Sequence, residues 1–143
     1  MDYEITPKAQ RLFPTAYELV LHEVLDALAR ELPAQTIQRL LSGVLRGLVE
    51  RNVGSLQSGR PSQRAIEFVE RIAPFAPGIT VTASGEATVV EGCSCPLASL
   101  TASHPDLCQL VAATLSETLG TGVREICDRG QWPRCRFEIA AVK

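Results

Sequence analysis

Ile79-Thr-Val-Thr-Ala-Ser-Gly-Glu-Ala-Thr-Val-Val90 is the stretch of sequence that decides the fold. On both sides of Ser84-Gly85 the residues alternate between apolar and polar, which is the pattern of two strands joined by a tight turn. The preceding Pro77-Gly78 marks the point at which the hydrophobic period changes from helical to strand-like. We therefore predict a β-hairpin here and a sheet that begins with it.

The residues after the hairpin predict one helix and a second pair of strands. A cysteine-bearing loop at 92–96 is followed by apolar residues at helical spacing from Pro105 to Leu119. Strand patterns then cover 123–128 and 134–141, with a turn at 129–133. The predicted order is ββαββ, an antiparallel sheet with one helix on a face, within an α+β fold.

Three amphipathic helices are predicted before the hairpin. Apolar residues recur with a helical period over 15–32, 34–52 and 61–73. We expect residues 1–60 to form a helical linker and dimerisation zone, because their stripes present more apolar surface than a small sheet can cover. Residues 61–143 are predicted to form a cysteine-bearing effector domain.

The composition is that of a folded domain with little net charge. Of the 143 residues, 45% are hydrophobic and 21% are charged, and the formal net charge is −2. Neither half of the chain is basic, so direct binding to nucleic acid is not expected. The sequence shows no apolar run of about 18 residues and no signal peptide, so we expect a cytoplasmic protein that does not enter a membrane.

Five cysteines, all between positions 93 and 135, are the most informative residues. Their number is odd and nothing indicates secretion, which favours metal binding or thiol chemistry over a disulfide framework. The predicted fold gathers Cys95 after the hairpin, Cys108 in the first turn of the helix and Cys135 at the start of the last strand. Packing alone also explains each cysteine, because free cysteine is among the most buried residue types.

Three cysteine-bearing segments follow a pattern known from one protein family. They are Cys95-Pro96, Pro105-Asp-Leu-Cys108 and, after Cys127 and the turn at Gly130, Cys135-Arg-Phe-Glu-Ile139. Together with Tyr3–Pro14, they resemble the effector domain of the SufR-like iron–sulfur transcriptional repressors and the linker that leads into it. The resemblance implies a homodimeric sensor domain that holds a [4Fe–4S] cluster through Cys95, Cys108 and Cys135.

The fourth cluster ligand is left open by this resemblance. Cys93, Cys127 and His104 are candidates, as is a ligand from outside the chain. The spacing Cys93-Ser-Cys95 is not part of the family pattern. The family's N-terminal helix-turn-helix is also missing from the sequence, so we expect that this chain does not read DNA by itself.

A weaker resemblance, to 4-vinyl-reductase-type domains, supplies an alternative function. It implies a regulatory domain that binds a small molecule or zinc, with cysteines that ligate the zinc or only pack. A third hypothesis is an enzyme with an open iron site or a Cys93/Cys95 redox pair. Because no acid–base constellation accompanies the cysteines, we predict a sensor and no enzymatic activity.

Overall fold

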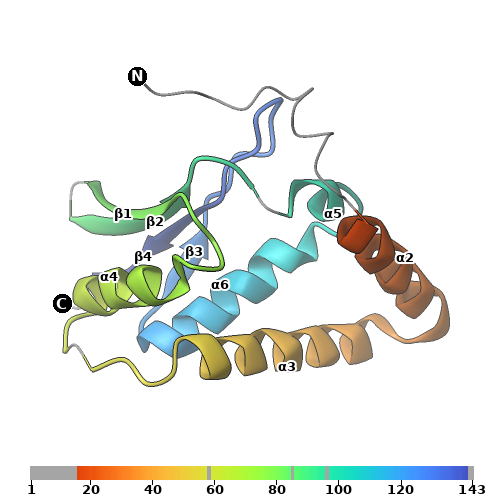
Figure 1. Ribbon diagram of the computed structural model, residues 1–143, viewed down its shortest axis with the longest axis horizontal. Helices are drawn as coiled ribbons and strands as arrows, with labels where there is room; N and C mark the ends of the chain where they lie inside the picture. Colours follow the sequence, from red (N-terminus) through yellow and green to blue (C-terminus); the bar gives the residue numbers. More distant parts are fainter. Residues whose placement is uncertain (1–15, 58, 85, 96, 142–143) are drawn as a thin grey trace. The chain divides into compact units, whose positions relative to one another are not determined.

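The computed structural model describes residues 16–57, 59–84, 86–95 and 97–141, which form five helices and one four-stranded antiparallel sheet (Figure 1). The segment Tyr3–Pro14, which carries part of the family resemblance, lies outside the described residues. The elements in chain order are α2 (Ala16–Glu31), α3 (Ala34–Asn52), α4 (Pro61–Ile72), β1 (Ile79–Ser84), β2 (Ala87–Gly92), α5 (Ala98–Ser103), α6 (Asp106–Leu119), β3 (Val123–Glu125) and β4 (Arg136–Ile139). The predicted mixture of helices and an antiparallel sheet is confirmed.

The chain divides into two compact units, one that ends at Ile37 and one that runs from Gln38 to Lys143. Helix α2 belongs to the first unit, and the sheet, α4, α5, α6 and most of α3 belong to the second. Within the described residues, no helix has the length and apolar character needed to cross a membrane. All the cysteines lie in the second unit.

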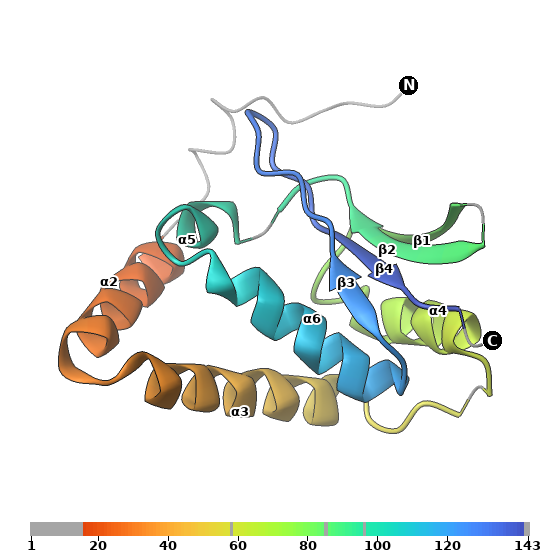
Figure 2. The same ribbon diagram turned by 180° about the vertical axis from the view of Figure 1, so that it is seen from behind.

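The sheet has the strand order β1-β2-β4-β3, so the two hairpins meet in its centre (Figure 2). In the central pair, β2 and β4 run antiparallel, and Val90 lies opposite Phe137. Strand β3 is shorter than predicted and ends at Glu125. Beyond Glu125 the two arms of the β3–β4 hairpin stay paired, through backbone hydrogen bonds of 2.9 and 3.0 Å between Asp128 and Arg134.

The connection between the two hairpins contains two helices, α5 and α6, where the sequence predicts one. The second of these begins at Asp106 and ends at Leu119, close to its predicted bounds. Helix α5 is only six residues long, and a single turn and a half cannot display a hydrophobic period. The backbone N–H of His104 closes this short helix with a hydrogen bond to the Leu100 carbonyl of 2.8 Å.

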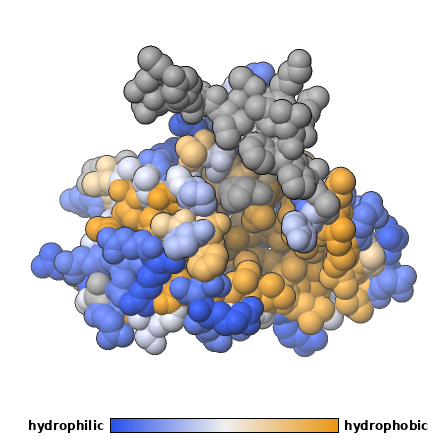
Figure 3. All heavy atoms as spheres, in the orientation of Figure 1, coloured by the Kyte–Doolittle hydropathy of each residue, from blue (hydrophilic) through white to orange (hydrophobic). Residues whose placement is uncertain are grey.

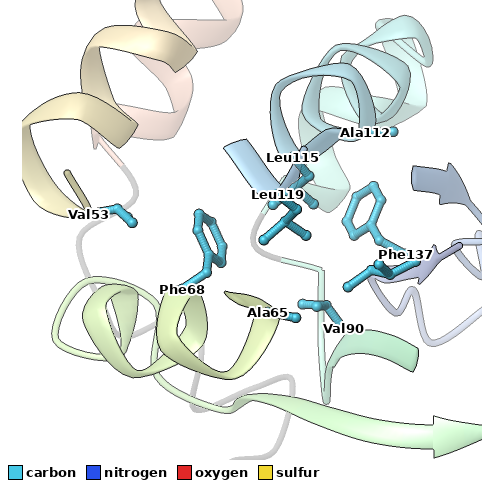
Figure 4. Packing of buried hydrophobic residues seen from close by; sticks show 9 residues of the cluster. Val53, Ala65, Phe68, Val90, Ala112, Leu115, Leu119 and Phe137 are labelled. Atoms are coloured by element: carbon cyan, nitrogen blue, oxygen red, sulfur yellow. The ribbon is translucent and has the colours of Figure 1, made fainter. Parts of the chain in front are cut away.

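The core lies between one face of the sheet and helices α4 and α6 (Figure 4). Buried side chains that meet there come from α4, α6, β2, β4 and the end of α3: Val53, Ala65, Phe68, Val90, Ala112, Leu115, Leu119, Phe137 and Ile139. The other face of the sheet carries charged pairs, among them Arg124 with Glu138 at 2.7 Å and Arg136 with Glu91 at 3.3 Å, beside the buried Val89. This difference between the faces fixes the strand register, because a shift of one residue would exchange them.

The C-terminal half of α3 packs against the rest of the second unit. Val49 packs against the core, and Arg46 forms an ion pair with Glu117 of α6 at 2.7 Å. Both charged side chains are more than half exposed, so the ion pair adds little stability, and the apolar contacts of Val49 and Val53 anchor the helix.

Replacement of a core isoleucine tests the assigned core. Ile139 is 1% exposed, whereas Ile66 on α4 is 48% exposed. We expect Ile139→Ala to lower the free energy of unfolding by about 2–5 kcal/mol, because it removes buried carbon atoms and leaves a cavity. The matched variant Ile66→Ala should lower it by less than about 1 kcal/mol. Urea denaturation followed by circular dichroism measures both, and equal losses would contradict the assignment.

Candidate metal centre

The loop that carries Cys95 is held against β4 at its first residue. The Gly92 N–H donates a hydrogen bond of 2.9 Å to the Cys135 carbonyl, so the loop leaves the sheet beside Cys135. A Cβ atom on Gly92 would lie 3.0 Å from the Ser94 carbonyl oxygen and 4.0 Å from Cys135 Cβ. Glycine therefore lets the loop fold back closely at this point without pressing on the Ser94 carbonyl.

The other cysteines of this region come from α6 and from the β3–β4 hairpin. Cys108 lies in the first turn of α6 and is buried. Cys127 and Cys135 are half-buried and lie on the two arms of the β3–β4 hairpin. The Arg136 N–H donates to Cys127 Sγ at 3.3 Å, and the Cys127 N–H donates to the Glu125 carboxylate at 3.1 Å. These bonds hold Cys127 across the hairpin from Cys135.

The thiols form two neighbouring pairs. Cys108 Sγ, Cys127 Sγ and a carboxylate oxygen of Glu125 all lie within 4.8 Å of one another. Cys95 and Cys135 form the second pair, in which burial and then hydrogen bonding with Cys95 raise the pKa of the Cys135 thiol. Burial also raises the pKa of Cys127 to about 11, with further contributions from Cys108 and Glu125. Burial and the neighbouring acidic groups therefore oppose the thiolate forms of Cys127 and Cys135, and a bound cation would favour those forms.

Two adjoining cavities open between these side chains. One, of about 240 Å³, is lined by Cys95, Cys108 and Cys127 together with residues of α5 and the 128–133 turn. The other, of about 160 Å³, is lined by Cys95, Cys108 and Cys135 together with residues of the core. Cys95 and Cys108 line both, while Cys127 lines only the first and Cys135 only the second.

Arg129 brings a positive charge to this region. Its guanidinium donates to the Glu125 carboxylate at 3.2 Å and to the Pro105 carbonyl at 3.4 Å. Hydrogen bonding to Cys108 and then the Glu125 charge raise the pKa of Arg129 above its ordinary value. Neither Arg129 nor Glu125 was predicted from the sequence. The spacing Glu125-x-Cys127 was the available signal, because residues two apart on a strand share a face.

Two other predicted candidates, Cys93 and His104, do not line either cavity. Cys93 is exposed, and a Cβ atom on Gly78, at the start of β1, would lie 3.1 Å from its Sγ. The φ angle of 82° at Gly78 is also one that glycine adopts readily, so both the backbone conformation and the nearby Cys93 sulfur favour glycine at this position. His104 ends α5, and its carbonyl accepts a hydrogen bond from the Leu107 N–H at 3.2 Å. Among the described residues that line the two cavities, neither Cys93 nor His104 is found.

A comparison of the sequence with models of known protein families found no match, and a search of curated proteins found no relative. The function of the chain is therefore inferred from its own residues and their geometry.

Thiol reactivity tests the arrangement in the metal-free protein. A pKa of about 11 leaves Cys127 with about a hundredfold less thiolate near pH 8 than the ordinary value of 9.0 would. We expect iodoacetamide to modify the exposed Cys93 first and Cys127 slowly, with the Cys127 rate still rising above pH 10. Peptide mass spectrometry of timed samples measures both rates. Equal rates at the two cysteines near pH 8 would show that Cys127 is not shielded.

Proposed function

We propose that this protein is an iron–sulfur sensor domain that binds a [4Fe–4S] cluster through Cys95, Cys108, Cys127 and Cys135. The observation that carries the proposal is that four thiols, from a loop, a helix and both arms of a hairpin, line two cavities that share Cys95 and Cys108. Four cysteine thiolates are the usual ligand set of such a cluster. Cys127 takes the fourth position because it lines a cavity together with Cys95 and Cys108, whereas Cys93 packs on Gly78.

A cluster and a single zinc ion require different spacings of their ligand sulfurs. Tetrahedral zinc with Zn–S bonds of about 2.3 Å needs its sulfurs roughly 3.8 Å apart. A cubane cluster binds each thiolate at a different iron, so its ligand sulfurs are spread more widely. Among the described residues, the sulfurs of Cys108 and Cys127 lie within 4.8 Å of each other, and this separation does not distinguish the two kinds of centre.

The raised pKa values in the site support thiols that lose their protons only when a metal binds. The raised pKa values of Cys127 and Cys135 mean that both thiols are neutral near pH 7 unless a cation is present. Ligation would release their protons, and Arg129 would then lie against the negative charge of the ligands. A cluster, when bound, supplies reversible one-electron chemistry and sensitivity to oxidants. This chemistry suits a regulatory sensor related to iron–sulfur or redox homeostasis, without an enzymatic reaction of its own.

Zinc is the second candidate, and one observation favours it. Cys108, Cys127 and Glu125 already place three ligand atoms within 4.8 Å of one another, which is close to what a single ion needs. Arg129 pairs with Glu125 at 3.2 Å, and it would have to release this carboxylate before an ion could bind there. A zinc-loaded protein would fit the alternative function, a zinc-binding regulatory domain of the 4-vinyl-reductase type.

The proposed assembly is a homodimer formed through α3. Leu40, Val44 and Leu48 recur every four residues on this helix, and their exposed fractions are 48%, 57% and 46%. Figure 3 shows that hydrophobic side chains reach the surface over a wide area of one face. A continuous apolar stripe of this kind is stable in water when a partner covers it. The net charge of −2 gives the domain no means to hold a phosphate backbone, so we propose no direct DNA contact.

Serine substitutions test the cluster ligands. We expect Cys95→Ser, Cys108→Ser and Cys135→Ser each to abolish a stable chromophore, because a hydroxyl is a poor substitute for a soft thiolate. Cys127→Ser should likewise leave only a labile chromophore, because each of these variants retains three thiolates of the proposed four. The measurements are the absorbance near 400 nm (roughly, as such clusters absorb) and the iron and sulfide content of anaerobically reconstituted protein.

Cys93→Ser is the matched control, because it removes a thiol that lies outside the proposed ligand set. It should retain full iron and sulfide content. The cluster proposal fails if reconstituted wild-type protein binds zinc and no iron, or if Cys108→Ser and Cys135→Ser retain wild-type iron.

A charge placed on the α3 stripe tests the dimer. We expect Val44→Glu to convert a dimer into a monomer, because it buries a carboxylate in an apolar interface. Gln38→Glu, on the same helix outside the stripe, adds the same charge and should remain dimeric. Multi-angle light scattering at tens of micromolar, roughly the range in which stable dimers persist, distinguishes the two. A monomeric wild-type protein would refute this assembly.

A further inference from the structure

The cavity of about 160 Å³ extends from the thiols into the core of the domain. Its walls are Phe68 and Ile72 of α4, Val111 and Leu115 of α6, and Val90 and Phe137 of the sheet. Cys95, Cys108 and Cys135 also line it. We call this space the apolar pocket.

The walls of the apolar pocket exclude water as a stable occupant. They consist almost wholly of carbon and sulfur atoms, whereas a buried water needs two to four polar partners. Glu91 is the one carboxylate among the lining residues, and its side chain is bound to Arg136 at 3.3 Å and to the Thr82 hydroxyl at 3.0 Å. Arg136 and Thr82 belong to the polar face of the sheet, so that carboxylate is directed away from the apolar pocket.

We propose that the apolar pocket is a binding site for an uncharged, apolar molecule of about the size of one aromatic ring. Apolar cavities of about 150 Å³ in proteins stay dry and bind benzene or xenon, which sets the size of the occupant. Protein interiors rarely leave a void of this size unfilled, so an occupant replaces contacts that the core lacks. Phe68 and Phe137 offer aromatic faces, and the sulfur atoms of the lining cysteines make favourable contacts with ring edges.

The inference goes beyond the proposed function, because the six wall residues belong to the core and form the apolar pocket without any metal. An occupant would nevertheless lie against Cys95, Cys108 and Cys135. The apolar pocket would therefore bring a small apolar effector into contact with the proposed cluster ligands.

Benzene is the probe for the test, added to the metal-free, full-length protein under reducing conditions. We expect saturable chemical-shift changes in ¹H–¹³C methyl spectra at Ile72, Val90, Val111 and Leu115, and a rise in the thermal midpoint. Val111→Phe should weaken benzene binding by about tenfold or more, because its ring would occupy the space. Val123→Phe is the control, since Val123 packs on the core but does not line the apolar pocket.

The inference is overturned if benzene, up to its solubility limit, produces no saturable shifts at the wall residues of the wild-type protein. It is also overturned if Val111→Phe and Val123→Phe bind benzene equally well. Should Val111→Phe fail to fold, the wild-type methyl shifts decide the question. Because no metal is present, these outcomes are independent of whether the protein binds a cluster.

Discussion

The antiparallel pairing of β2 with β4 aligns the elements on which the candidate site depends. Val90 opposite Phe137 places the core face of the sheet against α4 and α6, and two residues later the Gly92 N–H bonds to the Cys135 carbonyl. If β4 were shifted by one residue, Phe137 and Ile139 would exchange faces with Arg136 and Glu138, and Cys135 would no longer lie beside the start of the loop. The hydrophobic burial that fixes the register therefore also fixes the distance between the cysteine loop and Cys135.

The candidate site brings together groups that are unfavourable to bury separately. The thiols of Cys127 and Cys135 have raised pKa values because burial and their sulfur neighbours oppose the thiolate form. Arg129 offers the nearby positive charge, yet its side chain is 46% exposed and interacts partly through solvent. A bound metal centre would be the stronger source of positive charge, and its binding free energy would also order the hairpin and loop that carry the ligands.

The sequence predicted those features that depend on local periodicity. The bounds of α3 at Ala34 and Asn52 agree with prediction, because an apolar stripe over five turns has a clear period and Pro33 marks its start. The first hairpin was predicted from alternation on either side of its turn, and β1 and β2 confirm it. Helix α5 was missed because six residues are too few to display a period.

The composition of the thiol group depends on tertiary structure and could not be read from spacing alone. Cys93 and Cys127 are equivalent candidates in the sequence, but the contact of Cys93 with Gly78 and the position of Cys127 across the hairpin separate them. Arg129 joins the group only because the hairpin carries it back toward the start of α6 and the Pro105 carbonyl. Such contacts between distant segments have no sequence period.

The close packing of Gly92 has a consequence for the evolution of this site. A side chain at this position would press on the Ser94 carbonyl at 3.0 Å, and backbone atoms cannot move aside as a flexible side chain can. Homologous chains that keep this thiol arrangement should therefore keep glycine three residues before the loop cysteine, whatever their core residues become. Divergent relatives of this protein would then share a steric signature as well as a cysteine pattern, and a cysteine pattern without that glycine would indicate a differently built loop.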